Sequence, residues 1–209
     1  MADALLKEDR PASRVGPNAV IQLAAALRDR LGKQATDELF TRAGQHRYLV
    51  DPPGDMVDER VAAGLFECLF ADLPAATAAA VAAEAGRRTA DYILANRIPG
   101  PAQTLLKSLP PTFSAPLLMA AIAKNAWTFA GSGRVRTGTI STRRPSWVIE
   151  IADNPLAMPG CAWHGAVFKR LFQVLVAGDA SVRHPQCCHA GAPTCRFEIG
   201  RSSGAKSLL

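Results

Sequence analysis

The chain has 209 residues, 48% of them apolar, which suffices for one domain with a substantial core. Lys and Arg exceed Asp and Glu by six, but no basic stripe alternates with aromatic residues, which argues against nucleic-acid binding. The longest apolar stretch, residues 113–123, is too short for a membrane span, and residues 1–10 lack the pattern of a secretory signal.

The first half of the chain predicts a series of helices. Residues 1–16 are polar and mixed in charge, which predicts a flexible arm before a single domain at 17–200. Helices are expected at 19–31, where Gly32 ends the apolar period, at 35–43, and from residue 57 or 58 to residue 70. Pro74 then begins a long helix that reaches about residue 97 and is ended by Pro99 and Gly100.

The long helix has a charged face and a face of small residues. Its acidic and basic residues at positions 84, 87, 88 and 91 are spaced for ion pairs along the helix. On the opposite face, Gly86 lies four residues before Ala90, and a glycine inside a helix costs about 1 kcal/mol relative to alanine. Close approach of another helix would explain this glycine, and so would close approach of a flat ligand.

The second half of the chain mixes helices with strands. A short helix at 102–109 is followed by residues 113–129, which are apolar nearly all round and predict a buried helix. Residues 134–142 and 147–151 predict a β-hairpin with its turn at 143–146. A helix at 161–177 and strands at 180–183 and 195–199 complete an α+β fold with a small antiparallel sheet, before a polar tail at 201–209.

Three cysteines and a histidine near the C-terminal end predict a structural zinc site. Cys161 begins a helix, where the helix dipole favours a thiolate; His184 and Cys187 are three residues apart, and Cys195 begins the last strand. Zn²⁺ binds four such donors in a closed tetrahedron, which leaves no open position for catalysis. Cys188 is left out because adjacent side chains diverge. The alternative is that these thiols are ordinary core residues.

Cysteine usage also bears on the compartment. Five cysteines, an odd number, in a chain with no export signal favour a reducing cytoplasm and a metal site or free thiols over a disulfide framework.

The chain resembles the 4-vinyl-reductase domain family over about residues 18–200. The resemblance rests on residues 86–99 (GRRTADYILANRIP), on the hairpin and on the spacing of Cys161, Cys187 and Cys195, and it is strongest to the members from bacteriochlorophyll biosynthesis. Sensor domains of aromatic-responsive transcription activators share this fold and bind zinc with three cysteines and a carboxylate. At the matching position this chain has His184, which changes the charge of the site. The resemblance implies an α+β ligand-binding domain, structural zinc, a homodimer and a tetrapyrrole ligand.

The family name implies reduction of a vinyl group, but no reductant site is evident. No G-x-G-x-x-G follows a strand, and a zinc site uses the cysteines that an iron–sulfur cluster would need. We therefore expect a non-catalytic carrier in bacteriochlorophyll biosynthesis that holds an Mg-porphyrin or chlorophyllide for pathway enzymes. One alternative is a vinyl reductase, or a reductase subunit, acting on a divinyl (proto)chlorophyllide. Another is a regulatory sensor, although no DNA-binding or ATPase region is present.

A tetrapyrrole needs an apolar slot, cations for its carboxylates and a donor to its metal. The small-residue face of the long helix and the apolar segment after it predict the slot, with tryptophans stacked on the ring and arginines at the rim. The residues expected to bind it are Gly86, Ala90, Leu118, Ile122, Trp127, Trp147, Trp163, Arg87 and Arg134. The axial donor would be His46, His164 or His189. For each tryptophan the alternative is core packing.

Overall fold

The computed structural model describes residues 13–141 and 146–201 and combines helices with small antiparallel sheets. The helices are α1 (Asn18–Arg42), α2 (Arg47–Val50), α3 (Glu59–Asp72), α4 (Ala75–Asn96), α5 (Gly100–Ser108), α6 (Pro111–Lys124), α7 (Trp127–Ala130) and α8 (Ala162–Leu175), with 3₁₀-helices η1 (Pro159–Cys161) and η2 (Cys188–Ala190). The strands are β1 (Arg14–Val15), β2 (Val57–Asp58), β3 (Arg134–Ser141), β4 (Ser146–Ala152), β5 (Ala180–Gln186) and β6 (Thr194–Arg201). The predicted α+β class is confirmed.

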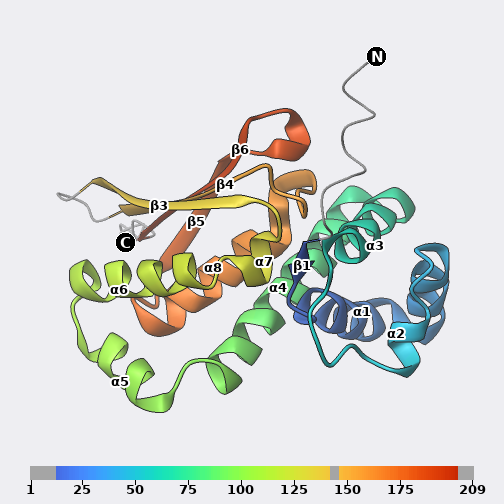
Figure 1. Ribbon diagram of the computed structural model, residues 1–209, viewed down its shortest axis with the longest axis horizontal. Helices are drawn as coiled ribbons and strands as arrows, with labels where there is room; N and C mark the ends of the chain where they lie inside the picture. The colour runs from blue at the N-terminus through green and yellow to red at the C-terminus, as the bar shows by residue number, and fades with distance from the viewer. Residues whose placement is uncertain (1–12, 142–145, 202–209) are drawn as a thin grey trace, which may run out of the picture.

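The N-terminal helices and the larger sheet occupy opposite ends of the molecule (Figure 1). Helices α1, α2 and α3 gather at one end, the larger sheet lies at the other, and α4 and α8 pack together between them. The larger sheet is antiparallel with strand order β3-β4-β6-β5. Its inner face buries Ile149, Ile151, Phe197 and Ile199. Because alternate residues of a strand share one face, these side chains form a continuous apolar layer.

The N-terminal boundary differs from the prediction. Strand β1 pairs with β2, and Val15 is fully buried. Residues 14 and 15 therefore belong to the folded domain, whereas the flexible arm was predicted to reach residue 16. The backbone of Gly32 has φ 85° and ψ 175°, which breaks α1 into the two helices expected from the sequence. Residues 1–12, most of the predicted tail (202–209) and most of the hairpin turn (142–145) lie outside the described residues.

Helix α4 lies against α8 at the small-residue face. A Cβ placed on Gly86 would lie 2.2 Å from the carbonyl oxygen of Trp163, so the backbone of α8 fills the space beside this glycine. Of the two explanations for Gly86, the structure supports close approach of another helix. The predicted ion pairs of Arg87 with Asp91 and of Arg88 with Glu84 are present, and Arg170 of α8 also pairs with Asp91 at 2.7 Å.

The helix predicted at 113–129 differs in two respects. It breaks between α6 and α7, and it is not buried all round, because Phe113 is 64%, Leu117 51% and Trp127 57% exposed. Only the face of α6 that carries Leu118 and Ile122 meets the core. An apolar composition on every face therefore gave no information about which face the core covers. None of the described helices is long and apolar enough to cross a membrane.

Candidate metal centre

The four predicted ligand residues come together in the structure. The candidate ligand atoms of Cys161, His184, Cys187 and Cys195 all lie within 4.8 Å of one another. The Sγ of Cys161 is 3.5 Å from the Sγ of Cys187 and 3.5 Å from that of Cys195. Two sulfurs bound at about 2.3 Å to one tetrahedral ion would lie about 3.8 Å apart, close to this spacing. The cluster could therefore hold a metal ion.

The four side chains come from the start of α8, from β5, from β6 and from Cys187, the residue between β5 and η2. Cys161 is the N-cap residue of α8, as predicted, and its φ of 43° places it in the left-handed region after Gly160, whose φ is 68°. A positive φ is uncommon outside glycine, so the surrounding structure holds Cys161 in a strained backbone conformation. His184 lies in β5 where the register with β6 shifts, and Cys195 lies in β6 opposite Ile151. The site thus joins the start of α8 to the sheet.

Hydrogen-bond donors surround the sulfur of Cys195. Its pKa is lowered to about 3, first by the Cys161 thiol, with further contributions from His184, the Cys188 backbone and Asn154. The Cys188 N–H lies 3.3 Å and Asn154 Nδ2 lies 3.4 Å from this sulfur. The same contact and burial raise the pKa of Cys161, so without a cation these two sulfurs share one proton. A metal ion would replace that proton and allow both to be thiolates.

His184 completes the donor set. Its ring stacks on Phe197 with centroids 4.5 Å apart, which fixes the orientation of the imidazole. Its Nε2 is buried and has no hydrogen-bond partner among the described residues. An imidazole beside three sulfurs, with a polar atom left unpaired, fits a soft or borderline cation.

Asn154 was missed from the sequence. Its Oδ1 accepts a hydrogen bond from the N–H of Leu156 at 3.1 Å, which orients Nδ2 toward Cys195. The signal was an Asn-Pro pair one residue after a strand, typical of an Asx turn, but nothing in the sequence linked that turn to the cysteines. Cys188, left out of the predicted set, lies outside the cluster, with its Sγ 3.7 Å from the Ile151 carbonyl oxygen.

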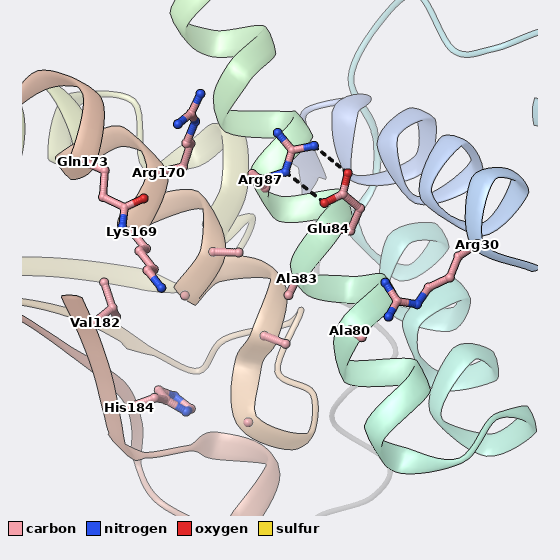
Figure 2. A pocket seen from close by; sticks show the side chains of 14 residues that line it. Arg30, Ala80, Ala83, Glu84, Arg87, Lys169, Arg170, Gln173, Val182 and His184 are labelled. Carbon is pink, nitrogen blue, oxygen red and sulfur yellow. Dashed lines mark hydrogen bonds and ion pairs between the residues drawn. The ribbon is translucent and has the colours of Figure 1, made fainter. Parts of the chain in front are cut away.

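A groove beside the metal centre lies between α4 and α8, and we call it the α4–α8 groove. Its volume is about 610 Å³. Small residues form its floor and basic side chains surround it, with Lys169 and His184 on one side and Arg30 on the other (Figure 2). Its lining residues are Arg30, Ala80, Ala83, Glu84, Arg87, Gly160, Ala162, Gly165, Ala166, Lys169, Arg170, Gln173, Val182 and His184.

The basic residues of the groove differ in whether a carboxylate of the protein already pairs with them. Arg87 pairs with Glu84 and Asp91, and Arg170 pairs with Asp91, so these guanidinium groups are already neutralised. No ion-pair or hydrogen-bond partner is found within the described ranges for Arg30 or Lys169. Since a cation with no local carboxylate is available for a ligand anion, these two are the stronger candidates for binding.

Of the ligand-binding residues predicted from the sequence, only Arg87 lines this groove. The other positions are in the core or on other surfaces: Gly86, Ala90, Leu118, Ile122, Trp147 and Trp163 are buried, Trp127 is exposed, and Arg134 pairs with Asp153 at 2.9 Å. His164, a predicted axial donor, is fully buried and contacts the Phe129 carbonyl oxygen at 3.1 Å. Arg30 and Lys169 were missed, although small residues at 162, 165 and 166 precede Lys169 at helical spacing.

Comparison with solved structures shows the fold. An H-NOX protein from S. oneidensis in the Fe(II)NO ligation state has a TM-score of 0.55 at 13% identity and covers 90% of this chain and 99% of its own. An Fe(II) unliganded H-NOX mutant from K. algicida has a TM-score of 0.59 at 12% identity, covering 91% and 98%. At these identities the likeness concerns the fold alone.

Comparison with curated proteins identifies relatives along nearly the whole chain. The bacteriochlorophyll synthase 23 kDa chain of Cereibacter sphaeroides is 44% identical over 194 residues, covering 90% of this chain and 91% of that protein. The protein of the same name from Rhodobacter capsulatus is 39% identical and covers 97% and 93%. No protein-family model matches, so the 4-vinyl-reductase domain stays a prediction. The chain belongs to the family of the bacteriochlorophyll synthase 23 kDa chain.

Proposed function

We propose that the chain binds a tetrapyrrole intermediate of bacteriochlorophyll biosynthesis, an Mg-porphyrin or a chlorophyllide, and holds it for pathway enzymes. The relatives named bacteriochlorophyll synthase 23 kDa chain support the pathway. Among the fold neighbours, one H-NOX study concerns heme distortion, so a protein of similar fold holds a tetrapyrrole. The resemblance to the 4-vinyl-reductase domain family agrees with such a ligand.

The observation that carries the proposal is the α4–α8 groove. Its volume of about 610 Å³ lies in the usual range for small-molecule sites. Ala83 on α4 and Gly165 and Ala166 on α8 form a floor without bulky side chains, which suits a flat ring. Arg30 and Lys169 would meet the acidic side chains at the edge of the ring, as charge-assisted hydrogen bonds to carboxylates. We place the ligand here and not among the core residues predicted from the sequence.

We further propose that the metal is zinc and that its role is structural. Three sulfurs and one imidazole form a donor set that zinc prefers in closed sites. His184 belongs to the metal centre and also lines the groove, and Gly160 and Ala162 flank Cys161. The metal centre would therefore fix one wall of the groove, and metal removal should weaken pigment binding.

The test is an absorbance titration of the purified protein with a divinyl chlorophyllide under anaerobic conditions, with and without NADPH. A spectral shift without turnover supports the carrier. Steady loss of the vinyl group would instead support the reductase alternative, and absence of any shift would contradict both.

Charge-reversal variants test whether the pigment binds in the α4–α8 groove. Lys169→Glu and Arg30→Glu should each weaken pigment binding about tenfold or more, because each removes a charged contact and adds repulsion. Arg47→Glu, on α2 and outside the groove, is the matched control and should bind as the unaltered protein does. If all three variants bound the pigment as tightly as the unaltered protein, the α4–α8 groove would not be the binding site.

A further inference from the structure

We propose that the chain docks on the surface of an anionic lipid bilayer through the exposed side of α5, α6 and α7, called here the α5–α7 face. Four large apolar side chains define it, Leu105, Phe113, Leu117 and Trp127, which are 54%, 64%, 51% and 57% exposed. The proposal goes beyond pigment binding and uses none of the residues that line the α4–α8 groove.

The apolar part of the face follows one stripe of α6. Phe113, Leu117, Ala120 and Lys124 are exposed and separated by four, three and four residues, so they lie along one side of the helix. The stripe carries no charge before Lys124 at the C-terminal end. Helices α5 and α6 lie at the edge of the molecule, away from α1, α2 and α3 (Figure 1). Large apolar side chains exposed along one side of a helix in this way indicate an interaction site.

The net positive charge of the chain arises between residues 92 and 149, a segment that includes α5, α6 and α7. Residues 92–149 contain seven Lys and Arg and no Asp or Glu, whereas the remaining residues contain 17 Lys and Arg and 18 Asp and Glu. The positive excess of the whole chain therefore comes from this segment, and two of its seven basic residues, Lys107 and Lys124, lie on α5 and α6. Lys107 and Lys124 are exposed near the C-terminal ends of α5 and α6. Anionic lipid headgroups attract basic residues so placed.

The geometry suits a helix that lies on a bilayer. Helix α6 has 14 residues and is therefore about 21 Å long, shorter than the roughly 30 Å hydrocarbon core. Phe113 and Leu117 would enter the boundary between headgroups and acyl chains, and Lys124 would extend to the phosphates. Trp127 would lie at the level that tryptophan prefers in membranes.

The positive charge of the α5–α7 face favours an anionic bilayer over a second copy of the chain as the partner. Two α5–α7 faces brought together would place lysines opposite lysines, with no acidic residue from 92 to 149 to neutralise them. An anionic bilayer supplies apolar chains for the stripe and phosphates for the lysines.

The full chain should be mixed with vesicles of phosphatidylglycerol and, separately, of phosphatidylcholine, and bound protein measured by co-sedimentation. Tryptophan emission gives a second readout, because Trp147 and Trp163 are 4% and 2% exposed while Trp127 is open to solvent. We expect binding and a blue shift with phosphatidylglycerol, both reduced by salt, and much weaker binding with phosphatidylcholine. No binding to phosphatidylglycerol vesicles overturns the proposal.

Variants test the face itself. Phe113→Asp combined with Leu117→Asp should abolish vesicle binding, and Lys107→Gln and Lys124→Gln should each weaken it about fivefold. Val50→Asp is the control, since Val50 is 78% exposed but lies on α2. Undiminished binding by the double variant contradicts the proposal. A second contradicting result would be that the unaltered protein is a dimer, that the double variant is a monomer, and that neither protein binds vesicles. That result would assign the face to contact with a second copy of the chain.

The pigment titration separates this proposal from the proposed function. The double variant should retain the spectral shift with chlorophyllide, because its substitutions lie outside the groove. Retained pigment binding together with lost vesicle binding supports both proposals. Vesicle binding by a chain that never binds pigment would remove only the proposed function.

Discussion

His164 is a fully buried imidazole surrounded by the rings of Phe129, Trp163, Phe168 and Phe197. Burial lowers its pKa to about 4, although its contact with the Phe129 carbonyl oxygen opposes the shift. The neutral ring is therefore the folded form. Because the unfolded chain takes up this proton near pH 6.5, stability should fall as the pH falls from about 6.5 toward 4, by roughly 3 kcal/mol from this group.

We expect His164→Gln to remove this part of the pH dependence, since an amide can still donate to Phe129 but cannot be protonated. Denaturant unfolding at pH values from 4 to 8 measures it. Metal loss at low pH affects both proteins alike, so the difference between them isolates His164. Parallel stability curves for the two proteins would show that the buried imidazole has no such role.

Asn154→Ala should weaken metal binding by about 10- to 100-fold, because it removes a hydrogen bond that orients and stabilises the Cys195 thiolate. Competition with a chelator of known affinity gives the measurement. Asn96→Ala, at an exposed position on α4, is the control. An unchanged affinity for Asn154→Ala would mean that its contact with sulfur does not support the site.

Among single residues, the sequence predicted the four candidate metal ligands, because soft donors close together in one segment have few other uses. It did not predict Asn154, Arg30 or Lys169. An asparagine in a turn and single basic residues on helices are common, and only tertiary packing places them beside a sulfur or a groove.

The packing of α4 against α8 depends on Gly86. Gly86→Ala should destabilise the protein by about 1 to 3 kcal/mol, because the added methyl meets the Trp163 carbonyl oxygen and α8 must move. Gly64→Ala is the matched control, since Gly64 is also inside a helix but a Cβ there meets nothing within 4 Å. That control should stabilise by up to about 1 kcal/mol. Thermal unfolding of both variants distinguishes the effects, and a stabilised Gly86→Ala protein would contradict the close packing.

Helices and strands were largely predictable because their apolar periods and their proline and glycine boundaries are local. The β1–β2 pair was missed, since two-residue strands carry no period. The exposed side of α6 was missed for a different reason. When all sides of a helix are apolar, only the arrangement of its neighbours decides which side stays open.

For the whole molecule, the metal centre should determine whether the C-terminal region folds. A structural zinc ion contributes on the order of 10 kcal/mol, which is comparable to the entire stability of a typical domain. Chelation, or Cys187→Ser, should therefore lower the melting temperature markedly and reduce pigment binding. Cys68→Ser, on α3 and outside the cluster, should do neither. Wild-type protein that is purified without metal and melts normally would contradict the structural role.

The contact between Cys161 and Cys195 has a consequence for which parts of the chain stay folded without metal. A shared ion there would tie the residue before α8 to β6, the last strand in the chain, and so close a loop containing α8 and β5. Such a cross-link restricts the unfolded chain, as a disulfide does. Chains without a bound metal ion would then keep their N-terminal helices while β5 and β6 exchange amide hydrogens rapidly and become open to proteases.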